Sequence, residues 1–125
     1  GVMGYVEVTS SQAGITAITD VTSATLTFTA VAGRRYKITG QARLTQLTNA
    51  GAIGLHIRES TTIIKSSTHG IPANETTTLN VMKVLTPSAG SHTYKLAISS
   101  TVASVGTTAS AAEPVVFVIE DIGPT

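Results

Sequence analysis

The chain has 125 residues, with 8 lysines and arginines against 7 aspartates and glutamates, and no cysteine. This length predicts a single domain over residues 1–125, which could equally be the C-terminal part of a longer polypeptide. A net charge of +1 argues against nucleic acid as a partner. The absence of cysteine excludes disulfide frameworks, zinc ribbons and thiol catalysis.

The composition favours strands. Valine, isoleucine and threonine contribute 12, 11 and 22 residues, whereas leucine and methionine contribute only 7 and 2. β-Branched side chains fit a pleated surface, and the residues that favour helices are scarce here. We therefore expect an all-β domain whose polar surface consists mainly of serine and threonine hydroxyls.

Alternation of apolar and polar residues marks the strands of the first half. The clearest runs from Tyr36 to Thr45, with apolar residues and glycine on one face and Lys37, Gln41 and Arg43 on the other. The other expected strands are Tyr5–Thr9, Ala24–Ala30, Ile53–Arg58 and Thr62–Ser66. Because Ser67–Asn74 contains Gly70 and Pro72, we predict a surface loop there.

In the second half we expect strands at Glu75–Leu85, Thr93–Ile98 and Val115–Glu120, and an irregular hairpin or bulged strand within Thr101–Ser110. The last strand is apolar on both faces, which predicts a central position covered on both sides. Its apolar run of five residues is far too short to span a bilayer, so we expect no membrane insertion. Eight or nine strands of this spacing indicate an antiparallel jelly-roll-like sandwich.

One internal similarity is visible. Residues 28–38 and 85–96 share the order apolar-Thr, then Ala-Gly, then Tyr-Lys-apolar, with one extra residue in the second copy. Both copies predict a strand, a tight turn and a second strand, with the tyrosine hydroxyl in contact with water. Two such units suit the two halves of a jelly roll, although reuse of a common Ala-Gly turn would also explain the pattern.

The titratable residues are not arranged for chemistry. Glu120 and Asp121 are adjacent, so in a strand they point to opposite faces and cannot act as an acid and base pair. His56 is expected on an outward face with Arg58, His69 in a loop and His92 in a turn. We predict no catalytic, cofactor-binding or metal-binding residue and no enzymatic activity. A hydrolase remains a third hypothesis that nothing in the titratable residues supports.

Arg34, Arg35, Lys37 and Arg43 form the only basic cluster. Three of them share one strand face over about 27 Å, which favours a solvated face or an intersubunit strip of ion pairs over an anion site. Few charges together with a positive mean hydropathy indicate that part of the surface is covered. A closed homo-oligomer is the economical explanation.

The segments at 28–40 and 85–96, together with the ending Val-Ile-Glu-Asp-Ile-Gly-Pro at 118–124, resemble the C-terminal domain of minor tail and tail-fibre-like proteins of bacteriophages that infect actinobacteria. The resemblance implies a virion structural protein and a sandwich similar to the trimeric jelly rolls of the complement and tumour-necrosis type. The family marks at Gly33, Tyr36, Gly90 and Tyr94 are turn and packing positions, so no functional residue is carried over.

Two functions follow from this resemblance. In the first, a homotrimer on the tail of the particle binds a receptor or glycan of the host surface, and the loops around Ser67–Asn74 are needed for binding. In the second, the chain is a capsid decoration or head-fibre protein that contacts other virion proteins and does not bind host cells. Both place the protein on the surface of the virion.

Overall fold

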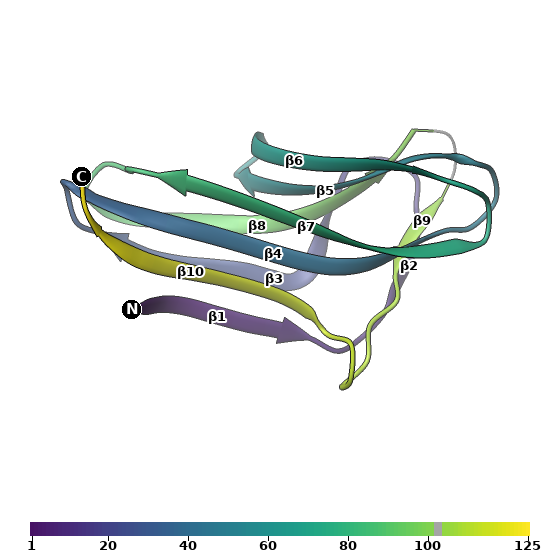
Figure 1. Ribbon diagram of the computed structural model, residues 1–125, viewed down its shortest axis with the longest axis horizontal. Coiled ribbons are helices and arrows are strands. Elements are labelled where there is room, and N and C mark those ends of the chain that lie inside the picture. The colour runs from purple at the N-terminus through teal and green to yellow at the C-terminus, as the bar shows by residue number, and fades with distance from the viewer. Residues whose placement is uncertain (102–103) are drawn as a thin grey trace.

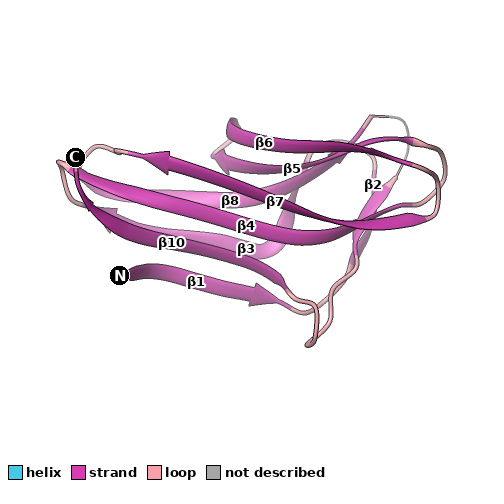
Figure 2. Ribbon diagram, viewed as in Figure 1, coloured by secondary structure: helices cyan, strands magenta, loops and turns pink. Residues whose placement is uncertain are grey.

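The longest strand, β4 (Arg34–Gln46), organises the computed structural model, which describes residues 1–101 and 104–125. Its side chains alternate between the core and the outer surface as the sequence predicts. The described residues form ten strands and two facing antiparallel sheets (Figures 1 and 2). The other strands are β1 (Val2–Val8), β2 (Gln12–Ile15), β3 (Thr19–Ala30), β5 (Gly51–Glu59), β6 (Thr62–Ile71), β7 (Glu75–Leu85), β8 (Gly90–Ser100), β9 (Val105–Thr107) and β10 (Val115–Pro124).

Sheet A contains β1, β10, β4 and β7 in that order, and the short strands β9 and β2 continue it beside the end of β4. Sheet B contains β3, β8, β5 and β6. The chain crosses between the sheets after β2, β3, β4, β6, β7 and β8, and this is the connectivity of a jelly roll. The predicted all-β antiparallel sandwich is confirmed, with ten strands in place of eight or nine.

The core lies between the inner faces of the two sheets. β4 contributes Tyr36, Ile38 and Leu44, each fully buried. The largest buried side chains from the other strands are Phe117 and Ile119 on β10, Ile53, Leu55 and Ile57 on β5, and Tyr94, Leu96 and Ile98 on β8. β10 is central in sheet A, as predicted, but only its inner face is fully covered, because Val116 and Val118 on the outer face are half-buried.

The two similar segments of the sequence are neighbours in the fold. Each forms a connection between the sheets, β3 to β4 and β7 to β8, and the two pair with one another, β3 with β8 and β4 with β7. The Phe28 ring packs on Tyr36 and Tyr94, with centroids 4.9 and 6.1 Å away. The structure therefore places the two copies in matching positions of the jelly roll.

The prediction that both tyrosine hydroxyls contact water was wrong. Tyr36 is fully buried, and its hydroxyl oxygen accepts a hydrogen bond from the Val31 backbone N–H at 2.9 Å, inside the turn that follows β3. Tyr94 is almost fully buried, and this burial raises its pKa to about 12. Tyr36 therefore connects the core to the turn after β3, and Tyr94 packs within the core.

Three segments differ from the sequence prediction. Ser67–Asn74 is not a loop, because β6 continues to Ile71 and only residues 72–74 form the turn. β6 lies at the edge of sheet B, and a strand at a sheet edge can carry polar residues on its exposed side. The region Thr101–Ser110 contains the short strand β9, and residues 102–103 lie outside the described residues. Strand β2 and the start of β3 were not predicted, since they lack regular alternation.

Gly106 provides a test of the packing of β2 on β9. A Cβ at this position would lie 2.5 Å from the Gln12 carbonyl oxygen and 3.1 Å from the Ala13 Cα. Gly106→Ala must therefore move the backbone of β2, and we expect a loss of about 1–3 kcal/mol in the free energy of unfolding, measured by urea denaturation. Gly70→Ala is the control, because its nearest neighbour would be 4.0 Å away. Equal effects of the two substitutions would contradict this packing.

Candidate functional site

The basic cluster of β4 does not converge on one point. Arg34 pairs with Asp121, with 2.6 Å between the guanidinium Nε and the carboxylate Oδ2, and Lys37 lies 3.7 Å from Glu120. The guanidinium of Arg34 holds the pKa of Asp121 below its usual value, helped by the Gly123 backbone N–H. Glu120 and Asp121 thus engage separate cations of the neighbouring strand. These four charges tie β10 to β4.

None of the three histidines lies opposite another histidine in the register of the strands. His69 is exposed on β6, which corrects the predicted loop position. His92 lies on β8 and not in a turn; its Nδ1 is 2.9 Å from a Glu59 carboxylate oxygen, and its Nε2 is 2.7 Å from the Ser88 carbonyl oxygen. These contacts raise the pKa of His92, with the Glu59 bond as the larger cause. Among the described residues there is no group of three or more acidic or histidine side chains that could hold a metal ion.

His56 is buried, which corrects its predicted outward exposure. It does lie on the outer face of sheet B, but the side chains of both neighbouring strands close over it. Its ring nitrogens are each 2.7 Å from a serine hydroxyl, Nδ1 from Ser66 on β6 and Nε2 from Ser99 on β8. Burial lowers the pKa of His56, and the nearby Arg58 cation lowers it further.

This Ser-His-Ser arrangement differs from a catalytic triad in one respect that decides its chemistry. In a triad, a carboxylate stabilises the imidazolium that forms when the serine loses its proton. Here the group opposite the serine is a second neutral hydroxyl, and Arg58 opposes a positive ring. The arrangement is therefore suited to holding β5, β6 and β8 together and not to general base catalysis.

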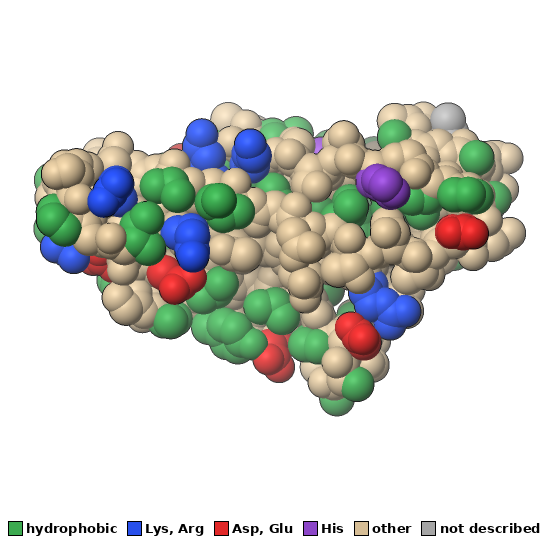
Figure 3. All heavy atoms as spheres, viewed as in Figure 1, with side chains coloured by type: hydrophobic (Ala, Val, Ile, Leu, Met, Phe, Trp, Pro, Cys, Tyr) green, Lys and Arg blue, Asp and Glu red, His purple; other side chains and the backbone are tan. Residues whose placement is uncertain are grey.

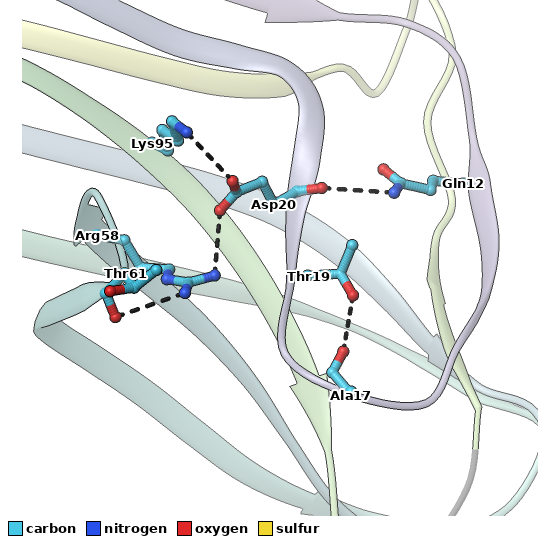
Figure 4. Close-up of polar contacts among 7 residues, drawn as sticks. All are labelled: Gln12, Ala17, Thr19, Asp20, Arg58, Thr61 and Lys95. Carbon is cyan, nitrogen blue, oxygen red and sulfur yellow. Dashed lines mark hydrogen bonds and ion pairs between the residues drawn. The ribbon is translucent and has the colours of Figure 1, made fainter.

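A second polar cluster on sheet B surrounds Asp20 (Figure 4). The Asp20 carboxylate is 3.3 Å from a guanidinium nitrogen of Arg58 and 3.4 Å from the Lys95 ammonium, so one acid bridges β3, β5 and β8. The Asp20 carbonyl oxygen also accepts a hydrogen bond from the Gln12 side chain on β2. This cluster could not be predicted from the sequence, because Asp20 lies in a part of β3 without regular alternation.

The outer face of sheet A presents a row of side chains across four strands, which we call the central row: Tyr5, Val118, Thr39 and Met82. Tyr5 and Met82 are 54% and 50% exposed. No member of the row is charged, and hydrophobic side chains gather over β1, β10 and β7 on this face (Figure 3). The row is a surface that another molecule can cover without burying an unpaired charge.

The two ends of the sandwich differ. Both termini lie at one end, where the N-terminal amine contacts Asp121 and the Thr125 backbone N–H bonds to the Gly33 carbonyl (Figure 1). We call the opposite end, formed by residues 47–50 and 72–74, the tip. It lies about 40 Å away along β4. The Asn74 backbone N–H donates to the Gln46 carbonyl oxygen at 2.6 Å and joins the two connections of the tip.

Comparison with known proteins yields fold likenesses only. No protein-family model matches the sequence, and no curated protein matches it. The Eiger TNF of S. frugiperda has a similar structure, with 9% identity, a TM-score of 0.46, and coverage of 91% of this chain and 92% of that one. The resemblance to actinobacteriophage tail proteins therefore stays a prediction.

Two further solved structures are similar over part of their length. The enzymatically active domain of bacteriophage CBA120 tailspike protein 4 has 13% identity and a TM-score of 0.34, and the match covers 96% of this chain but only 19% of that one. A CBM4 structure has 13% identity, a TM-score of 0.35, and coverage of 72% and 59%. At such low identity these likenesses say nothing about ligands or partners of this chain.

The two paired histidines predict opposite effects of pH on stability. His56 binds a proton less readily in the folded state, so its contribution is fully present above about pH 6.5 and is lost as the pH falls below that value. His92 binds a proton more readily in the folded state, so its contribution is present below about pH 6.5 and is lost as the pH rises through its raised pKa.

Urea denaturation at pH 8 and pH 5 tests this. Relative to the unsubstituted protein, His56→Gln is expected to lose less free energy of unfolding between pH 8 and pH 5, and His92→Gln is expected to lose more. If both substitutions change the pH dependence in the same direction, the assignment of the two environments is wrong.

Proposed function

We propose that the chain is a host-surface binding domain of a bacteriophage virion protein, that it acts as a homotrimer on the tail, and that it binds without catalysing a reaction. The observation that carries the proposal is the uncharged central row on the outer face of sheet A. The resemblance to tail proteins of actinobacteria-infecting phages supplies the biological setting and the number of subunits.

Electrostatics favours a second copy as the cover of this row. Two of the charges that flank the row, Lys37 and Glu120, pair with one another, and the Glu7 carboxylate accepts a hydrogen bond from the Tyr5 hydroxyl. Covering the row itself therefore buries no charged side chain, and Lys37 and Glu120 keep one another as partners. Val116 and Val118, half-buried in one chain, would become fully buried between chains. When a rotation axis repeats this contact between identical chains, the chains form a closed ring, and the row of every chain is covered by a neighbour.

The positions of the ends support a binding role. A chain that continues beyond either terminus would attach the sandwich to the particle at the terminal end, and the tip would then project outward. The connections of the tip are held by backbone hydrogen bonds, so they present a fixed surface. Three tips are held close together on one particle. Once one tip has bound a repetitive cell wall, the other two bind at a high effective concentration, so the attachment is stronger than that of a single weak site.

A non-enzymatic role agrees with what the charged side chains do. Within residues 1–101 and 104–125, the two polar clusters of sheet B connect strands, and the ion pairs of sheet A connect β10 to β4. Each of these contacts has a structural use.

The described residues contain no helix that could cross a bilayer.

Met82→Glu tests the homotrimer. A charge in the central row must be desolvated when a second copy covers it, so we expect the protein to dissociate to monomers at micromolar concentration, measured by light scattering after size exclusion. Ile63→Glu on β6 is the matched control, because Ile63 is 46% exposed against 50% for Met82 and lies on sheet B. A monomeric unsubstituted protein, or a trimer that withstands Met82→Glu, would overturn the interface.

Labelling of intact actinobacterial cells with the fluorescent purified protein tests the binding role. We expect specific labelling that Leu47→Asp, at the tip, reduces at least tenfold. Val31→Asp is the control, because Val31 is also exposed but lies in the turn at the terminal end. Absence of labelling across a panel of host species would favour a decoration protein of the particle. Equal labelling by both variants would remove the tip from the binding surface.

A further inference from the structure

A hollow of about 250 Å³ lies beside β3, at the end of β1 that points away from the N-terminus. It is lined by Val8, Ser10, Ser11, Gln12, Thr22 and Ser23, so its walls come from β1, from the connection to β2, from the first residue of β2, and from β3. Clefts for drug-sized ligands measure about 300–1,000 Å³, and this hollow therefore has room for a smaller molecule.

The hollow exists because β3 loses its register with β8. Pairing is regular up to Asp20 and resumes at Thr25, and the segment between them bulges. Ser23 adopts a φ of 69°, a left-handed conformation that costs free energy for a residue other than glycine. A regular strand would point these two adjacent side chains to opposite faces of the sheet, whereas in the bulge both Thr22 and Ser23 line the hollow.

Gln12 fixes the opposite wall. Its side-chain oxygen accepts a hydrogen bond from the Thr22 backbone N–H at 3.1 Å. Its side-chain nitrogen donates to the Asp20 carbonyl oxygen at 3.4 Å, and Figure 4 shows this second bond. Its backbone N–H donates to the Thr107 hydroxyl at 2.9 Å. Ser11 is held in the same way, since its hydroxyl donates to the Ala109 carbonyl and accepts from the Ala109 N–H. Both side chains are therefore in place before any ligand arrives.

The remaining hydroxyls are available to a ligand. Ser10, Thr22 and Ser23 are exposed, and none of the side-chain hydrogen bonds among the described residues involves their hydroxyls. Val8 and the Thr22 methyl group add apolar surface to the same walls. The described residues that line the hollow include no charged side chain and no aromatic ring. An ion would find no counter-charge there, and a flat aromatic ligand would find no ring on which to stack.

We infer that this hollow binds one neutral sugar unit of a host-surface glycan, an inference that rests on the proposed function. A sugar ring carries hydroxyls at its edge and C–H groups on its faces, and the hollow offers three free hydroxyls beside methyl carbons. A ligand of this size in a preformed site binds with a Kd on the order of millimolar. Three copies in the homotrimer convert this affinity into stable attachment to a repetitive glycan.

The test uses the unsubstituted protein and a variant that lacks the three hydroxyls, Ser10→Ala/Thr22→Val/Ser23→Gly. Valine keeps the shape of threonine, and glycine suits the positive φ of Ser23, so the variant is expected to fold. The control removes three exposed hydroxyls from β3 and β8 instead, Thr25→Val/Thr29→Val/Ser91→Ala. The probes are the methyl glycosides of glucose, galactose, mannose, arabinose and N-acetylglucosamine, with inorganic phosphate as a charged probe.

Binding is followed by the backbone amide signals of Ser11 and Ser23 in two-dimensional NMR during titration to tens of millimolar. At least one glycoside is expected to shift these signals, to lose at least tenfold in affinity in the triple variant, and to bind the control normally. The inference is overturned if no glycoside shifts them, if phosphate alone does, or if the triple variant binds as well as the control.

Cell labelling separates this inference from the proposed function. If the triple variant labels host cells as strongly as the control, the hollow is not the glycan site, while the host-binding role stands. If a glycoside binds the hollow but the unsubstituted protein labels no host cell, the sugar site stands and the host-binding role fails.

Discussion

The alternation of side chains along β4 is the constraint on which the rest of the structure depends. This one strand pairs with β10, β7 and β9, and its even-numbered residues from Tyr36 to Gln46 all face the core. A shift of pairing by one residue would turn this set outward and bury Lys37 and Arg43. The alternation of side chains along β4 therefore determines three features. They are the register of sheet A, the burial of the Tyr36 hydroxyl and the uncharged central row.

The scarcity of charge has a structural meaning once these positions are known. The acids Asp20, Glu120 and Asp121 each contact a cation on a neighbouring strand, so they act between strands of one chain. Such partly exposed pairs contribute about 0.2–1 kcal/mol each, which is a small part of the stability. Their larger effect is on the surface, because they remove net charge from the faces of the sandwich and leave threonines and apolar residues to meet other molecules.

The strong strands could be predicted from the sequence because their pattern is local. β4 alternates without interruption, and the similarity between residues 28–38 and 85–96 identified two units that the fold places side by side. His56 could not be placed in this way, since its burial depends on Ser66 and Ser99 from two other strands. The hollow was missed for the same reason: the bulge after Asp20 is a break in long-range pairing, and it leaves no local signal.

The side chains that line the proposed sugar site are not the side chains that stabilise the sandwich. Ser10, Thr22 and Ser23 are exposed and belong to a bulge and a connection, so their replacement removes no core contact. The core residues of β4 and β8 tolerate little change, because each fills space between the sheets. A chain built in this way can change the hydroxyls that face its ligand while the sandwich and its central row stay constant. Specificity in such a domain is therefore expected to vary where the sheets are irregular.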